Sequence, residues 1–319
     1  MRGKSGVNRA GPWGYLVDTE DAASEVSGSR LPIMLLSIFS PSAWRWKLRQ
    51  LYSRLRAALD GGIFIYPLPD GARFAVLSGD LFSEALFVSR GHEVKEMAWC
   101  RAWLRAGDTA IDCGANIGYW TAGLVQTVEG LKVLAVEGNS ATAGRLRRVI
   151  ERLRLPGVTV HEGILSASET EKLTLPTIAG REPWQRATAD EAGTNAITLD
   201  ALSQEAGFPT PALVKIDCEG YEVNILRGAT RMLGTVRPAF MIECNESALE
   251  GAGTTVAALF QLLAEARYSC FYLASFAGPC QPGAEIVGTP TATEFNFAAI
   301  PLELVAGERW TQSLAALGA

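Results

Sequence analysis

Three acidic side chains stand at the same place in three apolar runs, each followed by a cysteine. Asp112 closes "TAID", Asp217 closes "VKID" and Glu243 closes "FMIE". If the runs are neighbouring parallel strands, about 4.8 Å apart, their carboxyl ends share one rim and the acids form a row along it. Such a row repels itself unless a positive group or a shared proton lies among the acids. The pattern therefore indicates a ligand site, with the cysteines on the opposite, apolar side.

Asp217 and Glu219 are the candidates for catalysis. Both lie at the end of one apolar run, "VKIDCEG", where they would face the crevice at the strand ends. Lys215 stands two residues before Asp217 on the same strand face, so it can pair with Asp217 and keep that carboxylate ionised. A structural role at the rim is the alternative for both acids, with Glu219 holding the turn before the next helix.

A glycine-containing loop, "DCGANIG", follows the first acid and opens directly into a helix pattern. Gly114 and Gly118 permit a tight turn and the close approach of a ligand, and a helix N-terminus favours an anionic group. Glu137 follows roughly 20 residues later at the next strand end, where a ribose diol would find two acceptor oxygens. Asn116 occupies the second glycine position of GxGxxG, and no Walker A lysine follows. The loop therefore indicates only an adenosine-type ligand.

The elements that must position these residues alternate between strand and helix patterns from residue 109 onward. Continuous apolar runs predict buried parallel strands, and helical periodicity predicts the segments between them. We expect strands at 109–116, 131–138, 158–165, 212–220, 238–245, 268–274 and 294–301, and helices at 118–128, 140–155, 223–233 and 254–266. The expected fold is therefore α/β, a doubly wound sheet covered by helices on both faces.

The residues before this pattern are expected to form a separate extension. Stretch 42–59 predicts an amphipathic helix, because apolar side chains recur at helical spacing between basic residues. These side chains are Trp44, Leu48, Leu51, Leu55 and Leu59. We expect this face to pack on the main domain or on a partner subunit, in a homo-oligomer, with attachment to a membrane surface as the alternative. Asp70 and Gly71 predict a hairpin turn, and a helix is expected at about 92–105.

Composition narrows the classes of partner. The 319 residues are 48% hydrophobic with a net charge of −5 and no clustered basic stripe, so nucleic acid is not expected as a partner. The run "LPIMLLSIF" is far shorter than the roughly 20 residues of a spanning helix, and no signal-peptide pattern precedes it. We expect a cytoplasmic protein without a transmembrane segment. The six cysteines form no CxxC pair, so neither a zinc site nor a disulfide framework is indicated.

Over about residues 90 to 302 the sequence resembles the FkbM-type methyltransferases of the class I S-adenosylmethionine-dependent fold. The likeness rests on "DCGANIGYW", "LAVEGNS", "ITLDAL", "VKIDCEGYEVNILRGA", "RPAFMIE" and "FAAIP". It implies a Rossmann-like sheet of strand order 3-2-1-4-5-7-6 with an antiparallel last strand. The implied methyltransferase domain spans 91–302, between an extension at 1–90 and a tail at 303–319. The family usually has Glu-Pro after its second strand, whereas here Gly138 follows Glu137.

The resemblance also implies which residues bind the cofactor. The first loop should hold the methionine half of S-adenosylmethionine, Glu137 the ribose hydroxyls, and Ser166 and Ala167 the adenine edge. Glu93 lies near the place where the family carries a Tyr-Glu pair; its alternative is a solvated acid at a helix start. Asn139 is expected to cap the following helix rather than to contact adenine. The full expected set is Glu93, Asp112, Gly114, Ala115, Asn116, Gly118, Tyr119, Glu137, Asn139, Ser166, Ala167 and Asp217.

The same resemblance implies O-methylation of a hydroxyl on a sugar, a glycan or a polyketide-type product. A proton must leave such an acceptor, and Asp217 within hydrogen-bond reach would act as the base. The polar stretch 179–195 is long and irregular enough for a substrate lid. There Arg181, Trp184 and Arg186 would grip a sugar face and an anionic group. A surface loop with a packed tryptophan is the alternative.

Three other hypotheses remain open at this point. Mg²⁺ held by Asp217, Glu243 and Asn245 would relieve the repulsion among the acids and lower the pKa of an acceptor hydroxyl. We favour a metal-free Asp217, with the positive sulfonium and amino group of the cofactor beside Asp112. An NAD-dependent oxidoreductase would share the fold, but it would require a complete GxGxxG motif, which Asn116 interrupts here. A non-catalytic cofactor-binding protein would keep the pocket without turnover.

Overall fold

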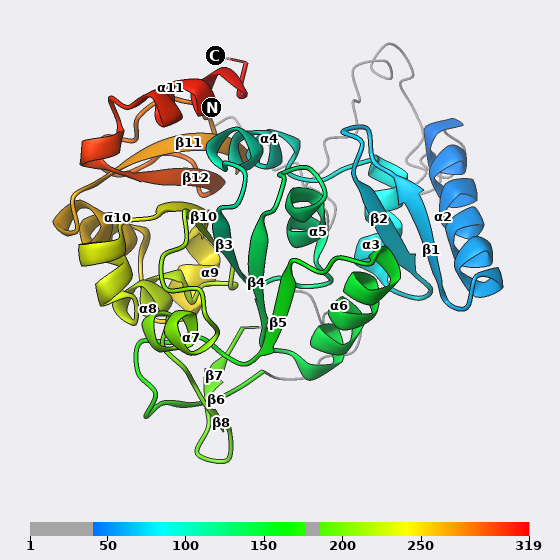
Figure 1. Ribbon diagram of the computed structural model, residues 1–319, viewed down its shortest axis with the longest axis horizontal. Coiled ribbons are helices and arrows are strands. Elements are labelled where there is room, and N and C mark those ends of the chain that lie inside the picture. The colour runs from blue at the N-terminus through cyan, green and yellow to red at the C-terminus, as the bar shows by residue number, and fades with distance from the viewer. Residues whose placement is uncertain (1–40, 176–185, 319) are drawn as a thin grey trace, which may run out of the picture. The chain divides into compact units, whose positions relative to one another are not determined.

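The computed structural model describes residues 41–175 and 186–318, with side chains from Lys47 onward. Its largest sheet contains β3 Thr109–Cys113, β4 Lys132–Glu137, β5 Val158–Glu162, β9 Leu213–Ile216, β10 Ala239–Asn245, β11 Tyr268–Ala277 and β12 Glu294–Pro301. The order across the sheet is β11-β12-β10-β9-β3-β4-β5 (Figure 1). β3, β4, β5, β9 and β10 pair in parallel, whereas β12 runs antiparallel to β10 and β11. The expected strand order, with its antiparallel last strand, is confirmed.

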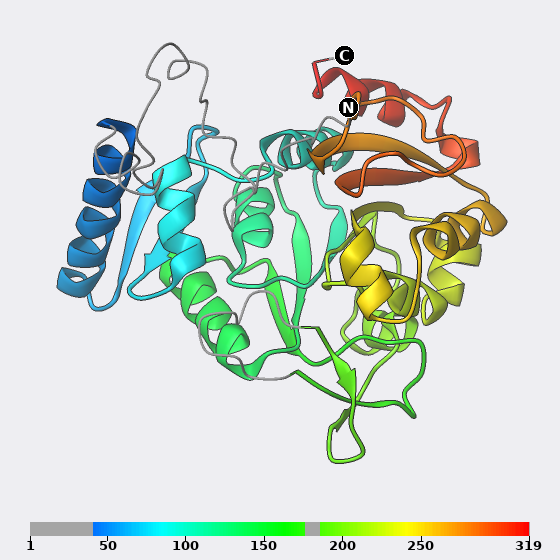
Figure 2. The ribbon, with the colours of Figure 1, turned by 180° about the vertical axis from the view of Figure 1, so that it is seen from behind.

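Helices cover both faces of this sheet, as Figures 1 and 2 show. One apolar core contains residues of α4 Val94–Trp103, α5 Tyr119–Val125, α6 Ser140–Leu153 and α11 Glu308–Ala315. The opposite core contains residues of α7 Leu199–Glu205, α8 Glu222–Arg227, α9 Glu246–Gly251, α10 Val256–Glu265 and a π-helix at Met232–Val236. Because strand side chains alternate, Ala110 belongs to the first core and Ile111 to the second. The doubly wound α/β fold is confirmed.

The segment before the sheet forms α2 Pro41–Leu59, β1 Ile63–Pro67, β2 Arg73–Leu77 and α3 Leu81–Ser89. β1 and β2 pair antiparallel across the turn at Asp70 and Gly71, which confirms the expected hairpin. β2 contacts α3, α5 and α6, and Leu48–Ala319 cluster as one compact unit. The division of the chain at residues 90 and 302 stays a prediction. A short 3-10 helix at Leu302–Leu304 follows β12.

The amphipathic helix is present, but its leucine row does not pack on the domain as expected. The side chains of Leu48, Leu51, Leu55 and Leu59 are 54 to 82% exposed. The opposite face is buried instead through Ser53 and Ala57, both 0% exposed, because small side chains let α2 lie close to its neighbours. Polar contacts hold that face. Gln50 and Arg54 both donate hydrogen bonds to the buried Glu84 carboxylate of α3.

Among the described residues, none of the helices combines the length and the apolar composition needed to cross a membrane. The expected cytoplasmic location stays a prediction. The expected lid is partly regular rather than irregular, because β7 Thr188–Ala189 and β8 Thr194–Asn195 both pair with β6 Lys172–Thr174. Backbone hydrogen bonds to β6 therefore order this part of the stretch. Arg181 and Trp184 lie outside the described residues.

Candidate functional site

The three rim acids come from adjacent strand ends, because β9 lies between β3 and β10 in the sheet. Asp112 stands beside Lys215 in the register, and Ile216 stands beside Ile242. Asp217 and Glu243 each follow one member of this last pair, so they lie side by side at the carboxyl ends of β9 and β10. The structure brings the three acids together on one rim, as their place in the sequence predicted.

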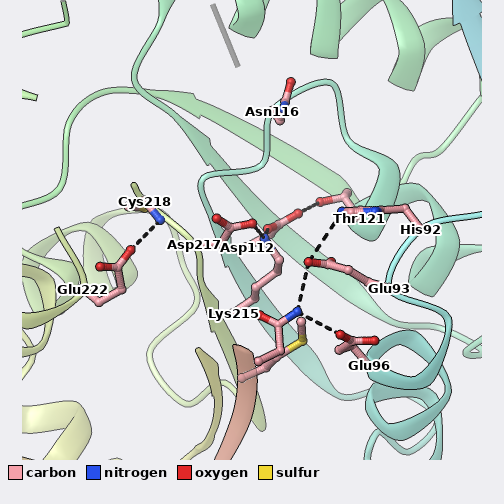
Figure 3. A network of polar contacts seen from close by, with 12 residues as sticks. His92, Glu93, Glu96, Asp112, Asn116, Thr121, Lys215, Asp217, Cys218 and Glu222 are labelled. Carbon is pink, nitrogen blue, oxygen red and sulfur yellow. Dashed lines mark hydrogen bonds and ion pairs between the residues drawn. The ribbon is translucent and has the colours of Figure 1, made fainter. Parts of the chain in front are cut away.

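Lys215 supplies the positive charge that this row of acids requires (Figure 3). Its Nζ lies 2.7 Å from Oδ2 of Asp217 and 3.9 Å from Oδ1 of Asp112, and its side chain is 5% exposed. Burial by itself lowers the pKa of the Lys215 ammonium. The negative charges of Asp217, Asp112 and Glu93 outweigh burial and raise that pKa well above its ordinary value. The ammonium therefore stays charged inside the rim.

Asp112 is completely buried at the end of β3. Its Oδ2 accepts a hydrogen bond of 2.5 Å from the Thr121 hydroxyl on α5. Its Oδ1 is buried without a hydrogen-bond partner among the described residues. Burial raises the pKa of the Asp112 carboxyl, and the attraction of Lys215 offsets part of that rise. A buried acceptor oxygen without a partner is costly, so this atom marks a place that a cationic or hydrogen-bonding ligand would stabilise.

Asp217 differs from the other carboxyls of the rim in its protonation. Burial acts to raise the pKa of Asp217, but Lys215 and an interaction with Glu243 lower it below the usual value. Burial, followed by the charge of Asp217, raises the pKa of Glu243 well above its usual value. Burial and the charges of Asp217 and Glu222 raise the pKa of Glu219 to about 8. At pH 7 the rim therefore combines an Asp217 held toward its ionised form with a protonated Glu219 and with a Glu243 whose pKa is shifted upward.

The turn between β9 and α8 is held by Glu222, not by Glu219. The Glu222 Oε1 accepts hydrogen bonds from the backbone N–H groups of Cys218, at 2.9 Å, and Gly220, at 3.2 Å. Burial raises the pKa of Glu222 to about 7. Glu219 occupies the left-handed region with φ of +53°, a conformation that costs energy for a non-glycine residue. The Glu219 carboxyl therefore forms none of the hydrogen bonds that hold this turn.

The loop after β3 approaches β9 so closely that only glycine fits at position 114. Gly114 has φ of +81°, and a Cβ there would lie 1.8 Å from the backbone oxygen of Asp217. Gly118, at the start of α5, has φ of +85°. Asn116 takes φ of +50°, and its backbone N–H donates to Oε2 of Glu137 at 2.9 Å. These conformations and contacts fix the course of the loop across the strand ends between Asp112 and Glu137.

Glu137 ends β4 on the other side of this loop. Its Oε1 accepts from the backbone N–H of Asn139 at 2.8 Å, and its Oε2 accepts from Asn116. Burial raises the pKa of the Glu137 carboxyl, and these backbone hydrogen bonds offset part of the rise. The Asn139 side chain accepts from the backbone N–H of Thr142 at 3.0 Å, so its expected role as the N-cap of α6 is confirmed.

Glu93 reaches the rim from the start of α4, where it has φ of +48°. Its Oε1 accepts a hydrogen bond of 3.1 Å from Nδ2 of Asn296 on β12, and the same Nδ2 donates to Glu96 at 2.9 Å. The Glu93 side chain is 7% exposed, so it is not the solvated helix-start acid considered as its alternative. Figure 3 shows Glu93 facing the group formed by Asp112 and Lys215.

The remaining expected cofactor residues lie around this centre in different environments. Tyr119 is 6% exposed, and its hydroxyl accepts from the backbone N–H of His92 at 3.0 Å, which ties α5 to the loop before Glu93. Ala115 is buried. The Ser166 hydroxyl is buried and donates to Glu171 at 2.7 Å, so that side chain is already engaged. Ala167, beside it, is half-buried.

The alternative magnesium set is not arranged as a ligand set. The Asn245 Oδ1 accepts from the backbone N–H of Ala248 and from the Ser247 hydroxyl, both at 3.1 Å, and it caps α9. Lys215 occupies the position beside Asp217 that a cation would need. No three His, Cys, Asp or Glu side chains within the described ranges are grouped to hold a metal ion. Helix capping therefore explains Asn245 without a metal.

Residues 112–270 match the family model described as the methyltransferase FkbM domain. This chain contains an FkbM methyltransferase domain. A curated relative, the hexuronic acid methyltransferase AglP of Haloferax volcanii, is 28% identical over 162 residues. That alignment covers 51% of this chain and 64% of the relative, so the chain spans less than two thirds of the relative's length.

Similar solved structures include a methyltransferase FkbM from Methylobacillus flagellatus and an S-adenosylmethionine-dependent O-methyltransferase from Thermotoga maritima. The first is 17% identical, with 68% of this chain and 52% of that chain covered and a TM-score of 0.39. The second is 14% identical, with 75% and 77% covered and a TM-score of 0.39. The strand order itself, rather than these scores, establishes the fold.

The FkbM domain, as matched, begins at Asp112 and includes Glu137, Lys215 and Asp217. Glu93 and Asn296 lie outside the matched range and reach the rim from α4 and β12. Sequence reasoning missed Thr121, Glu96 and Asn296. Asn296 interrupts the apolar run "FNFAAI", a signal that was available, whereas Thr121 and Glu96 stand in helices with nothing to distinguish them.

Arg186 is the member of the expected lid that the structure describes. Its Nε donates to the backbone oxygen of Glu219 at 3.1 Å. Its guanidinium also lies against Gly251, where an added Cβ would stand 1.8 Å from Nη1. Arg186 therefore links the 186–195 segment of the FkbM domain to the turn that carries Glu219, in a position beside the rim.

Proposed function

We propose that this chain is an S-adenosylmethionine-dependent O-methyltransferase acting on a hydroxyl of a sugar, glycan or polyketide-type product. The observation that carries the proposal is the Lys215 ion pair, which holds Asp217 ionised at the rim beside Glu219 and Glu243, whose pKa values burial raises. An ionised acid next to neutral acids provides both an acceptor and donors for protons in one crevice. The FkbM domain is consistent with this chemistry.

The residues of the loop fit the proposed cofactor. The buried Oδ1 of Asp112 has no hydrogen-bond partner among the described residues, so it can accept from an ammonium group. Each carboxylate oxygen of Glu137 accepts one backbone N–H and keeps lone-pair capacity for a ribose hydroxyl. Gly114 and Gly118 let the loop pack closely against the Asp217 backbone and Leu146, which fixes the loop between Asp112 and Glu137. S-adenosylmethionine, when bound, supplies a methyl group activated by its positively charged sulfonium.

The chain's own residues then position and deprotonate the acceptor. We assign Asp217 as the base, because 28% of its side chain is exposed and Lys215 keeps it ionised. A hydroxyl within hydrogen-bond reach would pass its proton to the Asp217 carboxylate. Glu219, protonated at pH 7, would donate a hydrogen bond to a neighbouring acceptor oxygen. Most of the rate enhancement would come from holding the hydroxyl oxygen in line with the bond between the sulfonium sulfur and the methyl carbon.

A sugar is the acceptor class that the comparisons favour. The relative AglP is named a hexuronic acid methyltransferase, and its likeness to this chain supports an acidic sugar among the candidate acceptors. Arg186, held beside Glu219, is placed to meet a carboxylate on such a sugar. Polyketide hydroxyls stay within the proposal, because an apolar acceptor would need only the Asp217 base and a fitting crevice.

Calorimetry and mass spectrometry together test the proposal. We expect saturable binding of S-adenosylmethionine and of its demethylated product, with no saturable binding of NAD. Glycans from cells with the gene should carry the mass of one additional CH₂ group compared with glycans from cells without it. The Asp217→Asn variant, expressed in the second strain, should bind the cofactor without restoring that mass.

The other outcomes would each contradict a different part. Binding of NAD in preference to S-adenosylmethionine would indicate an oxidoreductase. Cofactor binding with no methylated glycan or other hydroxyl product would support the non-catalytic alternative. Methylation restored by Asp217→Asn would leave the activity intact and remove Asp217 as the base.

A further inference from the structure

A second pocket, far along the chain from the rim acids, lies in the segment before the sheet. It has a volume of about 630 Å³ and is lined by residues of α2, β1 and α3 and of the loops that follow β1 and α3. Its polar and aromatic lining includes Arg49, Tyr52, Arg56, Tyr66, Phe87 and Arg90. We refer to it as the arginine pocket. It uses none of the residues assigned to methyl transfer, so it requires a separate explanation.

The arginine pocket is positive and selects for an anion. Arg49, Arg56 and Arg90 line it, and among the described residues no Asp or Glu does. Arg49 donates to the backbone oxygen of Phe87 and lies over the Phe87 ring at 5.3 Å, which holds its guanidinium in place. The nearby acid, Glu84, is 1% exposed and paired with Arg54, so it does not neutralise the pocket. Guanidinium groups arranged in this way recognise phosphate or carboxylate.

Tyr66 adds an independent sign of a ligand. Its side chain is 7% exposed and lines the pocket, yet its hydroxyl is buried without a hydrogen-bond partner among the described residues. A buried hydroxyl usually has a partner, since leaving it unpaired costs free energy. A phenylalanine would fill the same space without that cost. The Tyr66 hydroxyl is therefore an unpaired donor in the wall of a pocket whose arginines attract an anion.

The exposed leucines of α2 lie next to this pocket. Leu48, Leu51, Leu55 and Leu59 recur at helical spacing and form one ridge, which we call the leucine ridge. Arg49 and Arg56 follow Leu48 and Leu55 directly, so they stand along one flank of the ridge, on the pocket side. α2 contains five basic residues and no acidic residue, in a chain whose net charge is −5. Arg54 pairs with the buried Glu84, so Arg49 and Arg56 supply the positive charge along this flank of the ridge.

We propose that the leucine ridge and the arginine pocket dock the protein on an anionic membrane surface. The leucines would enter the boundary between headgroups and acyl chains, while the flanking arginines contact lipid phosphates. One headgroup phosphate would occupy the arginine pocket and accept from Tyr66. Each arginine near such a surface strengthens binding about fivefold.

A second copy of the chain fits this face less well than a membrane does. A symmetric dimer through α2 would place the same surface opposite itself, so Arg49, Arg56 and Arg90 of one copy would face those of the other. Like charges at close range oppose such contact. Asp60, the exposed acid that follows α2, is already paired with Arg152. An anionic lipid surface is complementary to both the ridge and the arginines.

Vesicle co-sedimentation of the full chain tests the proposal. We expect binding to phosphatidylcholine vesicles that contain phosphatidylglycerol, and at least tenfold weaker binding to phosphatidylcholine alone. Leu51→Glu combined with Leu55→Glu should weaken binding to the anionic vesicles by more than about tenfold. Arg56→Gln and Arg90→Gln should each weaken it about fivefold. Tyr66→Phe should weaken binding while its thermal midpoint stays equal to that of the wild type or rises.

Matched control variants lie elsewhere on the surface. Val287 is 85% exposed and Arg227 is exposed on α8, so Val287→Glu and Arg227→Gln should bind vesicles as the wild type does. Thermal melts confirm that every variant is folded. Equal loss in the controls, or no binding of the wild type to either vesicle, would overturn the proposal. So would a wild-type dimer in sedimentation that Leu51→Glu with Leu55→Glu dissociates, with no vesicle binding, because the ridge would then be a subunit interface.

Discussion

Replacing Lys215 by methionine should reveal how strongly the rim acids depend on one buried cation. The change keeps most of the apolar stem of the side chain and removes the charge that lies 2.7 Å from Asp217 and 3.9 Å from Asp112. Removing one partner of a buried ion pair costs about 3–5 kcal/mol of folding free energy. Asp217 is 28% exposed and can be hydrated, whereas Asp112 is fully buried. We therefore expect about 3 kcal/mol, mostly from Asp112.

The loss should depend on pH. Burial already raises the pKa of Asp112 above its ordinary value, and removing Lys215 raises it further. A carboxyl whose pKa is higher in the folded than in the unfolded protein stabilises the fold less as pH rises toward the folded pKa. The difference in unfolding free energy between the wild type and Lys215→Met should therefore be larger at pH 8 than at pH 5. Urea unfolding followed by tryptophan fluorescence at both pH values measures it.

The double variant Lys215→Met with Asp112→Asn provides the control. Asparagine leaves no charge to bury, and its side-chain oxygen can still accept from the Thr121 hydroxyl. The double variant should recover most of the stability lost in Lys215→Met, and the pH dependence of the difference should disappear. A single variant as stable as the wild type at pH 8, or a double variant no more stable than the single one, would refute this account of the rim.

Four further outcomes follow from the site. Asp217→Asn should lower turnover by about 10²–10⁴ at unchanged cofactor affinity, measured by a methyl-transfer assay; normal turnover would show that the proton leaves by another route. Glu137→Ala should weaken S-adenosylmethionine binding by about 1–3 kcal/mol in calorimetry, and an unchanged affinity would remove Glu137 from the site. Because burial raises the pKa of Glu219 to about 8, its loss of a proton should make kcat/KM fall as pH rises through that value. Glu219→Gln should keep activity without this decline, and the same decline in both proteins would assign it to another group. Activity should survive treatment with EDTA; loss that Mg²⁺ restores would favour the metal hypothesis.

Local patterns in the sequence predicted most of the fold and the composition of the rim. Strand alternation and helical spacing repeat every few residues, so they identify the strands, the helices and the acids that end β3, β9 and β10 without any knowledge of the fold. The pairing of Lys215 with Asp217 was also predicted, because both stand on one strand face two residues apart. Even the capping role of Asn139 follows from its place before a helix.

Only the tertiary structure decided which side chains contact one another across the sheet and how burial shifts their pKa values. Asn296 joins Glu93 and Glu96 across 203 and 200 residues of chain, and no local periodicity encodes such a contact. The protonation of Glu219 and Glu243 depends on burial by elements far apart in sequence. The ridge on α2 shows the same limit. The helical spacing of its leucines predicted an apolar face. Whether the leucines or the opposite face with Ser53 and Ala57 packs on the domain depends on the neighbouring elements, which the spacing does not specify.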